Sequence, residues 1–220
     1  MRMRKKPNLL PRMERCADVL VKEPEKLRGR WLETFPGHSA LHIELGCGKG
    51  RFTLGTAQAA PQVLLAAVER VPDAMVVAME RVCGAQAENV RFMDADAAKL
   101  AEYFAPGEAE RIYINFCDPW PKSRQAKRRL TAPGFLKLYL EVLKPGGEIH
   151  FKTDNGPLFD FSLESFESAG FTLREVTRDL HADGPCGVMT DYEEKFYAQA
   201  LPINRCVAVA PEKKTESAEC

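Results

Sequence analysis

The sequence predicts an α/β fold with one seven-stranded, mostly parallel sheet and helices on both faces. From Leu41 onward, short apolar runs alternate with longer amphipathic stretches, as they do where strands alternate with helices. Glycine and proline punctuate these segments, most clearly at Pro145-Gly146-Gly147. At 220 residues, the chain is suited to one large domain with short extensions.

The expected strands are short apolar runs, and they cover residues 41–45, 63–69, 90–93, 111–116, 148–152, 171–176 and 195–201. The expected helices cover residues 51–60, 72–85, 97–104, 132–143 and 158–169. In the fourth helix, apolar side chains recur from Phe135 to Leu143 at helical spacing and give one apolar face. Pro72 stands at the start of its helix, where no N–H is needed, and Pro145-Gly146-Gly147 ends helical structure before a strand.

Local composition divides the chain into three parts. Residues 1–30 hold ten Lys or Arg against four Asp or Glu and are interrupted by three prolines, which predicts a basic N-terminal arm. Residues 31–210 form the main domain, and we expect residues 211–220 to be a mobile tail.

The overall composition excludes several classes of protein. Thirty-one basic residues balance thirty-one acidic ones, so bulk charge indicates no particular partner. The longest apolar run, Val63 to Val68, has six residues, too few to cross a membrane. Seven cysteines without a Cys-x-x-Cys pair argue against both a disulfide framework and a zinc site. We therefore expect no metal and no membrane segment, and a cytoplasmic protein with reduced thiols.

Three glycines, Gly46, Gly48 and Gly50, follow the first strand and precede a helix. Such a loop lets the backbone turn tightly and approach a ligand, although a purely structural turn remains an alternative. Glu69 ends the second strand, where an acidic side chain can accept both hydroxyls of a ribose. The pattern predicts a bound nucleotide.

The charges near the glycines indicate which ligand is bound. Glu44 lies two residues before the first glycine and would repel a pyrophosphate, whereas it suits the sulfonium and ammonium of S-adenosylmethionine. Asp96 and Asp118 follow the third and fourth strands. Because the carboxyl ends of parallel strands share one edge of the sheet, we expect these carboxylates to converge there, although any one alone could be a solvated loop end.

Asp118 begins a rigid turn, Asp118-Pro119-Trp120-Pro121, in which two φ angles are fixed. Trp120 is suited to stacking on an unpaired base, or it is simply a packed surface aromatic. Residues 122–129 then hold five cations and no acid. Such a run is usually a solvated face, but beside a predicted reaction site it favours contact with a polyanion.

Five segments together resemble the bacterial tRNA (guanine-N7-)-methyltransferase family over about residues 24–202: 44–50, 118–122, 127–129, 152–155 and 190–193. The resemblance implies a Rossmann-like class I methyltransferase. Its implied reaction transfers a methyl group from S-adenosylmethionine to N7 of guanine at position 46, in the variable loop of tRNA, and gives 7-methylguanosine.

The resemblance also implies roles for individual residues. The cofactor contacts are Glu44, Gly46, Gly48, Gly50, Glu69, Asp96 and Asp118, and Asp118 is also the catalytic position. The substrate contacts are Lys122, Asp154, Thr190, Asp191, Tyr192 and Glu193. The RNA-contacting stretch is Arg124, Gln125, Ala126, Lys127, Arg128 and Arg129, with Gln125 where the family usually has His.

The implied chemistry agrees with the residues present. Guanine N7 already carries a lone pair, so alignment suffices and no catalytic base is needed. Asp118 could stabilise the cationic product or accept a hydrogen bond from the N–H edge of the base. An RNA or protein amino-group methyltransferase and a non-catalytic RNA-binding module are the alternatives, and both a monomer and a homodimer are compatible with the sequence.

Overall fold

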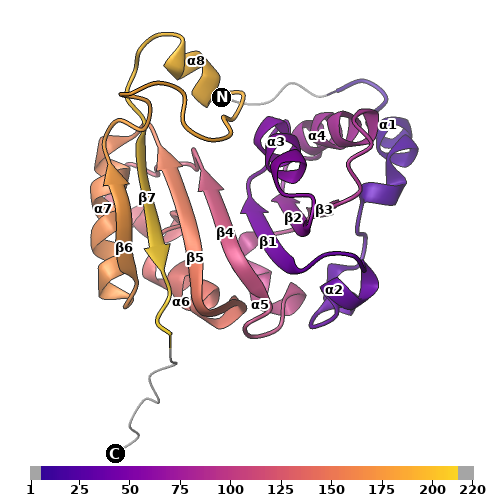
Figure 1. The fold of residues 1–220 in the computed structure, drawn as a ribbon, viewed down its shortest axis with the longest axis horizontal. Helices are drawn as coiled ribbons and strands as arrows, with labels where there is room; N and C mark the ends of the chain where they lie inside the picture. The colour runs from indigo at the N-terminus through magenta and orange to yellow at the C-terminus, as the bar shows by residue number, and fades with distance from the viewer. Residues whose placement is uncertain (1–5, 213–220) are drawn as a thin grey trace, which may run out of the picture.

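The computed structural model describes residues 6–212, which form a seven-stranded sheet with helices on both faces (Figure 1). The strands are β1 (Ala40–Leu45), β2 (Val63–Glu69), β3 (Val90–Asp94), β4 (Ala109–Asn115), β5 (Leu143–Thr153), β6 (Thr172–Thr177) and β7 (Asn204–Val209). Their order across the sheet is β3-β2-β1-β4-β5-β7-β6, and β7 runs antiparallel to both of its neighbours while β1 to β5 are parallel. The predicted α/β class with a mostly parallel sheet is confirmed.

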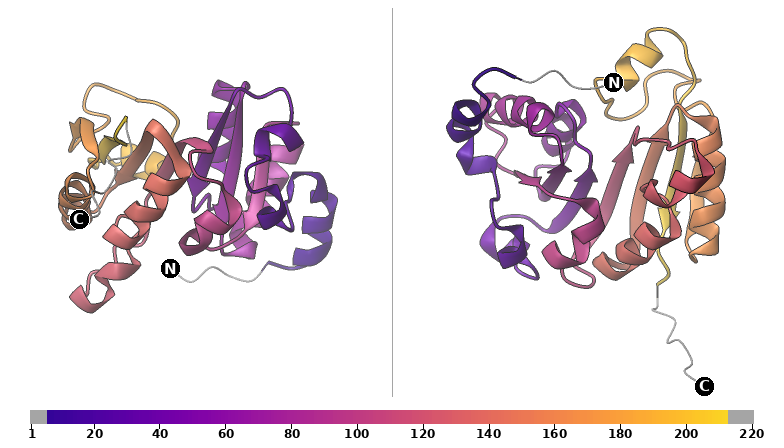
Figure 2. Two further views of the ribbon diagram at one scale, coloured as in Figure 1. Left: turned by 90° about the horizontal axis from the view of Figure 1, so that it is seen from below. Right: turned by 180° about the vertical axis from the view of Figure 1, so that it is seen from behind.

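The helices that cover the sheet are α3 (Arg51–Ala59), α4 (Pro72–Gly84), α5 (Leu100–Tyr103), α6 (Pro133–Val142) and α7 (Gly156–Ser168). Helices α3 and α4 pack on β2 and β3, whereas α6 and α7 lie behind β5 and β7 on the opposite face, as the view from behind in Figure 2 shows. The shorter helices are α1 (Leu9–Arg15), α2 (Trp31–Thr34) and α8 (Glu193–Tyr197). The 3-10 turns are η1 (Ala17–Val19), η2 (Pro24–Leu27), η3 (Ala97–Lys99) and η4 (Ser123–Arg128). None of the helices in residues 6–212 has the length and apolar character that spanning a bilayer would require.

One predicted strand is wrong. Residues 195–201 do not form a strand, because α8 occupies residues 193–197 and the last strand is β7 at 204–209. The Thr190 hydroxyl accepts a hydrogen bond from the Glu193 N–H at 2.9 Å, and the Glu193 carboxylate accepts one from the Thr190 N–H at 3.1 Å. This reciprocal pair is a capping box, which begins a helix.

The strand predicted at 148–152 is longer than expected. β5 begins at Leu143, and its pairing with β4 shifts register between Ala109 and Arg111. Pro145-Gly146-Gly147 therefore lies within the irregular first part of β5 and does not precede the strand.

The segment predicted as a basic arm lies, from residue 6 onward, against the sheet domain. The Arg12 guanidinium donates to the Glu80 carboxylate on α4 at 2.7 Å, and the Val21 N–H donates to the Phe92 carbonyl on β3 at 2.8 Å. Trp31 is fully buried, and its ring stacks on Phe104 with 5.2 Å between centroids. The division at residue 30 stays a prediction, and the predicted tail beyond residue 212 lies outside the described residues.

The carboxyl ends of β1, β2, β4 and β5 meet at one edge of the sheet. Residues 178–203, which connect β6 to β7 and include α8, pass over this edge at the top of Figure 1. We call residues 178–203 the crossing segment. It places side chains from late in the sequence beside the predicted glycine loop.

Candidate active site

Two cavities lie at the carboxyl ends of the strands. The smaller has a volume of about 470 Å³ and the larger about 830 Å³. Both are lined by Gly46 and by the four consecutive residues 115–118 at the end of β4. The two cavities therefore share a wall, and the exposed side chain of Asp118 is part of it.

The cavities divide the predicted site residues between them. The smaller cavity is lined by Glu44, Gly48, Asp154, Thr190, Asp191 and Tyr192. The larger is lined by Glu69, Asp96, Trp120, Lys127 and Arg128. The predicted residues that line neither are Gly50, Lys122, Arg124, Gln125, Ala126, Arg129 and Glu193.

The glycine loop has the backbone geometry that its sequence predicts. Gly46 and Gly48 have φ angles of +81° and +56°, which favour glycine, and a Cβ at either would meet nothing within 4 Å. Gly50 also has a positive φ, +78°, but a Cβ there would lie 2.5 Å from the Ala78 Cβ on α4. Gly46 and Gly48 leave room for a ligand, whereas Gly50 lets α3 pack closely on α4.

Glu69 is held by the backbone around it. One carboxylate oxygen accepts a hydrogen bond from the Gly48 N–H at 2.9 Å, and the other accepts from the N–H groups of Arg70 and Val71 at 2.9 Å each. A carboxylate has about four lone-pair sites, so capacity for a further donor remains. Glu69 thus fixes the glycine loop as well as lining the larger cavity.

Asp96 begins the turn after β3. Its carboxylate accepts a hydrogen bond from the Ala98 N–H at 3.0 Å, and it lies 3.2 Å from the Arg70 guanidinium. Asp96 therefore has a fixed place in the wall of the larger cavity.

Glu44 is an acidic side chain with almost no contact with solvent, since it is 2% exposed. The Thr53 hydroxyl donates to its carboxylate at 2.6 Å. Burial, together with the nearby charge of Glu69, raises the pKa of Glu44 to about 7, against the opposing effects of the Thr53 hydrogen bond and the Lys152 charge. A cationic group bound in the smaller cavity would favour the ionised form of Glu44.

The turn after β4 has an unusual backbone. Phe116 and Trp120 have φ angles of +52° and +42°, a region that side-chain-bearing residues rarely adopt. The Arg128 guanidinium lies 3.8 Å from the centre of the Trp120 ring. The predicted stacking of a base on Trp120 therefore competes with a cation–π contact that already covers one face of the ring.

Three other residues at this junction were not predicted from the sequence. Asn115, Phe116 and Cys117 line both cavities. The side-chain oxygen and nitrogen of Asn115 are buried and have no hydrogen-bond partner within residues 6–212. Burial raises the pKa of the Cys117 thiol to about 12, which keeps it protonated. Only their position at the end of a strand, beside Asp118, could have indicated them.

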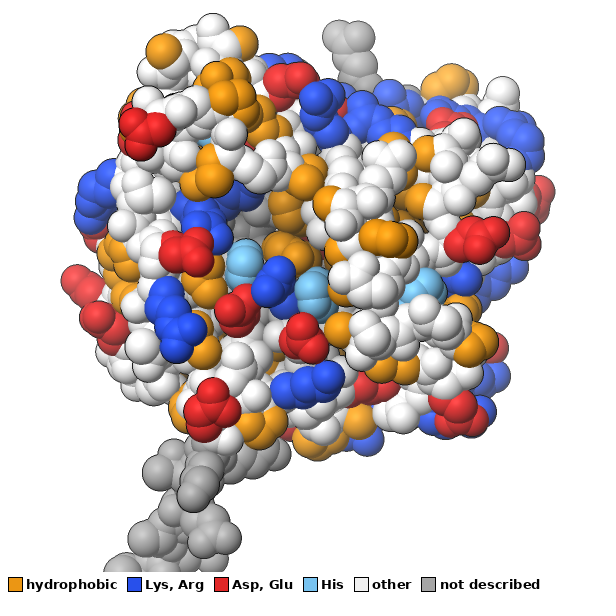
Figure 3. Space-filling model, viewed as in Figure 1, with side chains coloured by type: hydrophobic (Ala, Val, Ile, Leu, Met, Phe, Trp, Pro, Cys, Tyr) orange, Lys and Arg blue, Asp and Glu red, His pale blue; other side chains and the backbone are white. Residues whose placement is uncertain are grey.

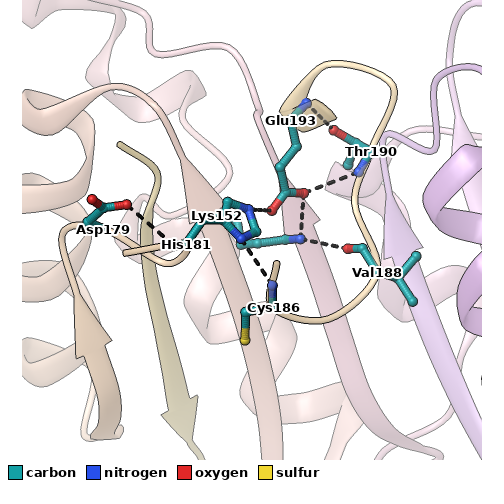
Figure 4. Close-up of polar contacts among 7 residues, drawn as sticks. All are labelled: Lys152, Asp179, His181, Cys186, Val188, Thr190 and Glu193. Atoms are coloured by element: carbon teal, nitrogen blue, oxygen red, sulfur yellow. Dashed lines mark hydrogen bonds and ion pairs between the residues drawn. The ribbon is translucent and has the colours of Figure 1, made fainter. Parts of the chain in front are cut away.

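The crossing segment is joined to β5 by a buried ionic network (Figure 4). Glu193 is fully buried, and its carboxylate lies 2.7 Å from the Lys152 ammonium and 3.1 Å from the His181 ring. The Lys152 ammonium also donates to the Val188 carbonyl at 3.0 Å. Desolvation lowers the pKa of Lys152, and the adjacent Glu193 carboxylate opposes this. Glu193 therefore lines neither cavity, and its carboxylate instead holds the crossing segment against β5.

Two further contacts hold the crossing segment at the cavity. The Arg81 guanidinium on α4 binds the Asp191 carboxylate through two hydrogen bonds of 2.7 and 2.9 Å. The Tyr192 hydroxyl donates to the Asp154 carboxylate at 3.4 Å. Asp191 and Tyr192 are thereby held at the wall of the smaller cavity.

The predicted basic run forms an exposed surface next to the larger cavity. Most of it lies in η4, and Lys122, Arg124, Lys127 and Arg128 are exposed. Arg129, which follows η4, is only partly exposed. The cations of the run are therefore not equivalent.

The histidines lie apart from the cavities. The lining residues within 6–212 include no histidine, and Figure 3 shows histidines among acidic and basic side chains in the middle of one face. Burial lowers the pKa of His42 and of His150 to about 4. In the described part of the chain, no group of three or more His, Cys, Asp or Glu is arranged to hold a metal ion.

Several known proteins resemble this chain in sequence. A family model described as a putative methyltransferase matches residues 38–206. A protein of Bacillus velezensis is 46% identical over 93% of this chain and 95% of its own. One of Listeria innocua is 43% identical over 94% and 98%, and one of Bacillus subtilis is 44% identical over 93% and 97%. All three are named tRNA (guanine-N(7)-)-methyltransferase.

Solved structures show the same fold at lower identity. The 16S rRNA methyltransferase KamB has a TM-score of 0.64 and 14% identity over 83% of this chain and 93% of its own. The antibiotic-resistance methyltransferase Kmr has a TM-score of 0.58 and 21% identity over 83% and 92%. The predicted Rossmann-like methyltransferase fold is confirmed. The matched family model and the similarity over nearly the full chain show that this protein belongs to the bacterial tRNA (guanine-N7-)-methyltransferase family.

Proposed function

We propose that this protein transfers a methyl group from S-adenosylmethionine to N7 of guanine in tRNA, at position 46 of the variable loop, and so forms 7-methylguanosine. The observation that carries the proposal is the meeting of two cavities at Asp118. A methyl donor and its acceptor must meet in one place, and this junction offers room for a ligand on each side.

The residues of the site fit the proposed cofactor. In the larger cavity, Glu69 would accept a hydrogen bond from a ribose hydroxyl, and Asp96 would accept from the adenine amino group. The open space over Gly46 and Gly48 would take the amino-acid end, with Glu44 near its ammonium. S-adenosylmethionine carries no phosphate, so these acidic walls have no phosphate charge to repel.

The remaining space of the smaller cavity would take the guanine. Asp154, Asp191 and Tyr192 form its far wall and offer hydrogen-bond acceptors and an aromatic ring. When bound, S-adenosylmethionine supplies an electrophilic methyl group, and guanine N7 has a lone pair that needs no prior loss of a proton. Asp118 would then stabilise the positive charge of the methylated base or accept a hydrogen bond from its N–H edge.

The exposed cations beside the larger cavity support tRNA as the partner. Lys122, Arg124 and Lys127 are free to approach phosphates, and each phosphate contact releases counterions. A polyanion bound across this surface would bring one of its bases toward the cavity junction. We further propose that the protein works in the cytoplasm, where tRNA is found, as a monomer or a homodimer.

The experiment is methyl transfer from labelled S-adenosylmethionine to purified tRNA, followed by digestion and nucleoside analysis. We expect the label in 7-methylguanosine only. Label in a methylated amino group would favour the alternative amino-group enzyme instead. Tight tRNA binding with no transfer would favour a non-catalytic RNA-binding module.

A further inference from the structure

Arg129 differs from the other cations of the basic run in what it contacts. Its Nε–H donates to the Pro119 carbonyl at 3.0 Å, and its Nη2–H donates to the Trp120 carbonyl at 3.1 Å. The face of the guanidinium lies 4.3 Å from the centre of the Phe161 ring on α7. One side chain thus joins the turn after β4 to a helix behind the sheet.

The turn that Arg129 holds is unfavourable in isolation. Trp120 has a φ of +42°, which costs free energy for a residue with a side chain and persists only where the surroundings impose it. Pro119 and Pro121 on either side have no N–H with which to close the turn. Two charge-assisted hydrogen bonds from a planar guanidinium to consecutive carbonyls supply that constraint.

The geometry points to a role for Arg129 other than contact with RNA. We propose that Arg129 is a positioning residue, which fixes the Asp118–Trp120 turn and with it the Asp118 carboxylate at the junction of the two cavities. Its planar guanidinium is already bonded to backbone carbonyls and stacked on Phe161, whereas Arg124 is exposed. The inference rests on the proposed function in one respect only, which is the effect of Arg129 on the rate of methyl transfer.

Two variants separate positioning from phosphate contact. Arg129→Lys keeps the positive charge, so a phosphate contact would largely survive, but a single ammonium cannot reproduce the fork that bonds two carbonyls. Arg124→Ala removes an exposed cation and serves as the reference for a lost phosphate contact. Thermal melting followed by circular dichroism confirms that each variant is folded before it is compared.

The first measurement compares salt dependence with rate. For Arg129→Lys we expect the wild-type slope of log Kd for tRNA against log salt, and a single-turnover rate at saturating tRNA at least tenfold below that of wild type. For Arg124→Ala we expect a slope flatter by about 0.7 to 0.9. A third variant, Arg129→Ala, is measured in the same way. If Arg129→Lys keeps the wild-type rate and Arg129→Ala flattens the slope as Arg124→Ala does, the inference is overturned.

The second measurement needs no RNA. The chain has two tryptophans, and Trp31 is fully buried, so Trp31→Phe leaves Trp120 as the reporter of the turn. In this background we expect Arg129→Lys to raise the acrylamide quenching constant of Trp120, and Arg124→Ala to leave it unchanged. An unchanged constant in Arg129→Lys contradicts the inference. If wild-type protein methylates no tRNA, the proposed function fails, but quenching still decides the role of Arg129.

Discussion

The Lys152 ammonium on β5 lies 2.7 Å from the Glu193 carboxylate at the start of α8, and both side chains are buried. This ion pair joins the sheet to the crossing segment, which carries Asp191 and Tyr192 to the smaller cavity. The His181 ring and the Thr190 N–H bind the same carboxylate. The shape of the smaller cavity therefore depends on a contact between residues that are not themselves at its surface.

Removing one member of this pair should be costly. Glu193→Ala leaves the Lys152 ammonium buried without its partner, and we expect a loss of about 3 to 5 kcal/mol in the free energy of unfolding. The double variant Lys152→Met/Glu193→Leu leaves no unpaired charge and should lose less than Glu193→Ala alone. Urea denaturation measures both. A Glu193→Ala variant within about 1 kcal/mol of wild type would show that the pair does not support the segment.

Gly48 and Gly50 form a matched pair in one loop. A Cβ at Gly50 would lie 2.5 Å from the Ala78 Cβ and 2.7 Å from its Cα, whereas a Cβ at Gly48 meets nothing within 4 Å. Gly50→Ala should therefore lower the melting temperature strongly, because α3 and α4 must move apart. Gly48→Ala carries only the cost of a positive φ, about 1 kcal/mol. Equal melting temperatures for the two variants would disprove the packing role of Gly50.

The buried carboxyl of Glu44 should make stability depend on pH. Its folded pKa of about 7 lies above the ordinary value of 4.5, so the unfolded chain releases the proton first as pH rises. The contribution of the Glu44 carboxyl to the free energy of unfolding is fully present below pH 4.5 and falls by about 3 kcal/mol as the pH rises to 7. Relative to Glu44→Gln, the wild type should lose free energy of unfolding across this window. Parallel pH profiles for the two proteins would refute the raised pKa.

Asp118 is the carboxylate common to both cavities. We expect Asp118→Ala to lower the single-turnover rate by about a hundredfold to a thousandfold, equal to about 2.7 to 4 kcal/mol, while the affinity for either substrate changes much less. Because N7 loses no proton, the wild-type rate should be nearly flat from about pH 6 to pH 9. Rapid-quench kinetics measures both. A mutant that keeps most of the rate would make Asp118 only the end of its strand.

Site residues at the ends of strands could be predicted from the sequence better than those held by long-range contacts. Glycines and carboxylates that directly follow strands have to lie at one edge of a parallel sheet, so the meeting of Glu44, Glu69 and Asp118 follows from local pattern. Thr190-x-x-Glu193 has the pattern of a capping box, which would have predicted α8 in place of the strand expected at 195–201.

Other contacts could not be predicted in this way. The partners Lys152 and Glu193 are 41 residues apart, and their pairing depends on how the crossing segment returns over the sheet. The basic run likewise gave no reason to separate Arg129 from its neighbours. Only its bonds to the Pro119 and Trp120 carbonyls distinguish it.

The most direct test of the proposed function changes a single atom of the substrate. A tRNA that carries 7-deazaguanosine at position 46 has a carbon in place of N7 and keeps the rest of the base. We predict that the protein binds this tRNA as tightly as the unmodified one, and that nucleoside analysis finds no methyl group at that position. Methylation of the 7-deaza tRNA at the wild-type rate would contradict the assignment of N7 as the acceptor.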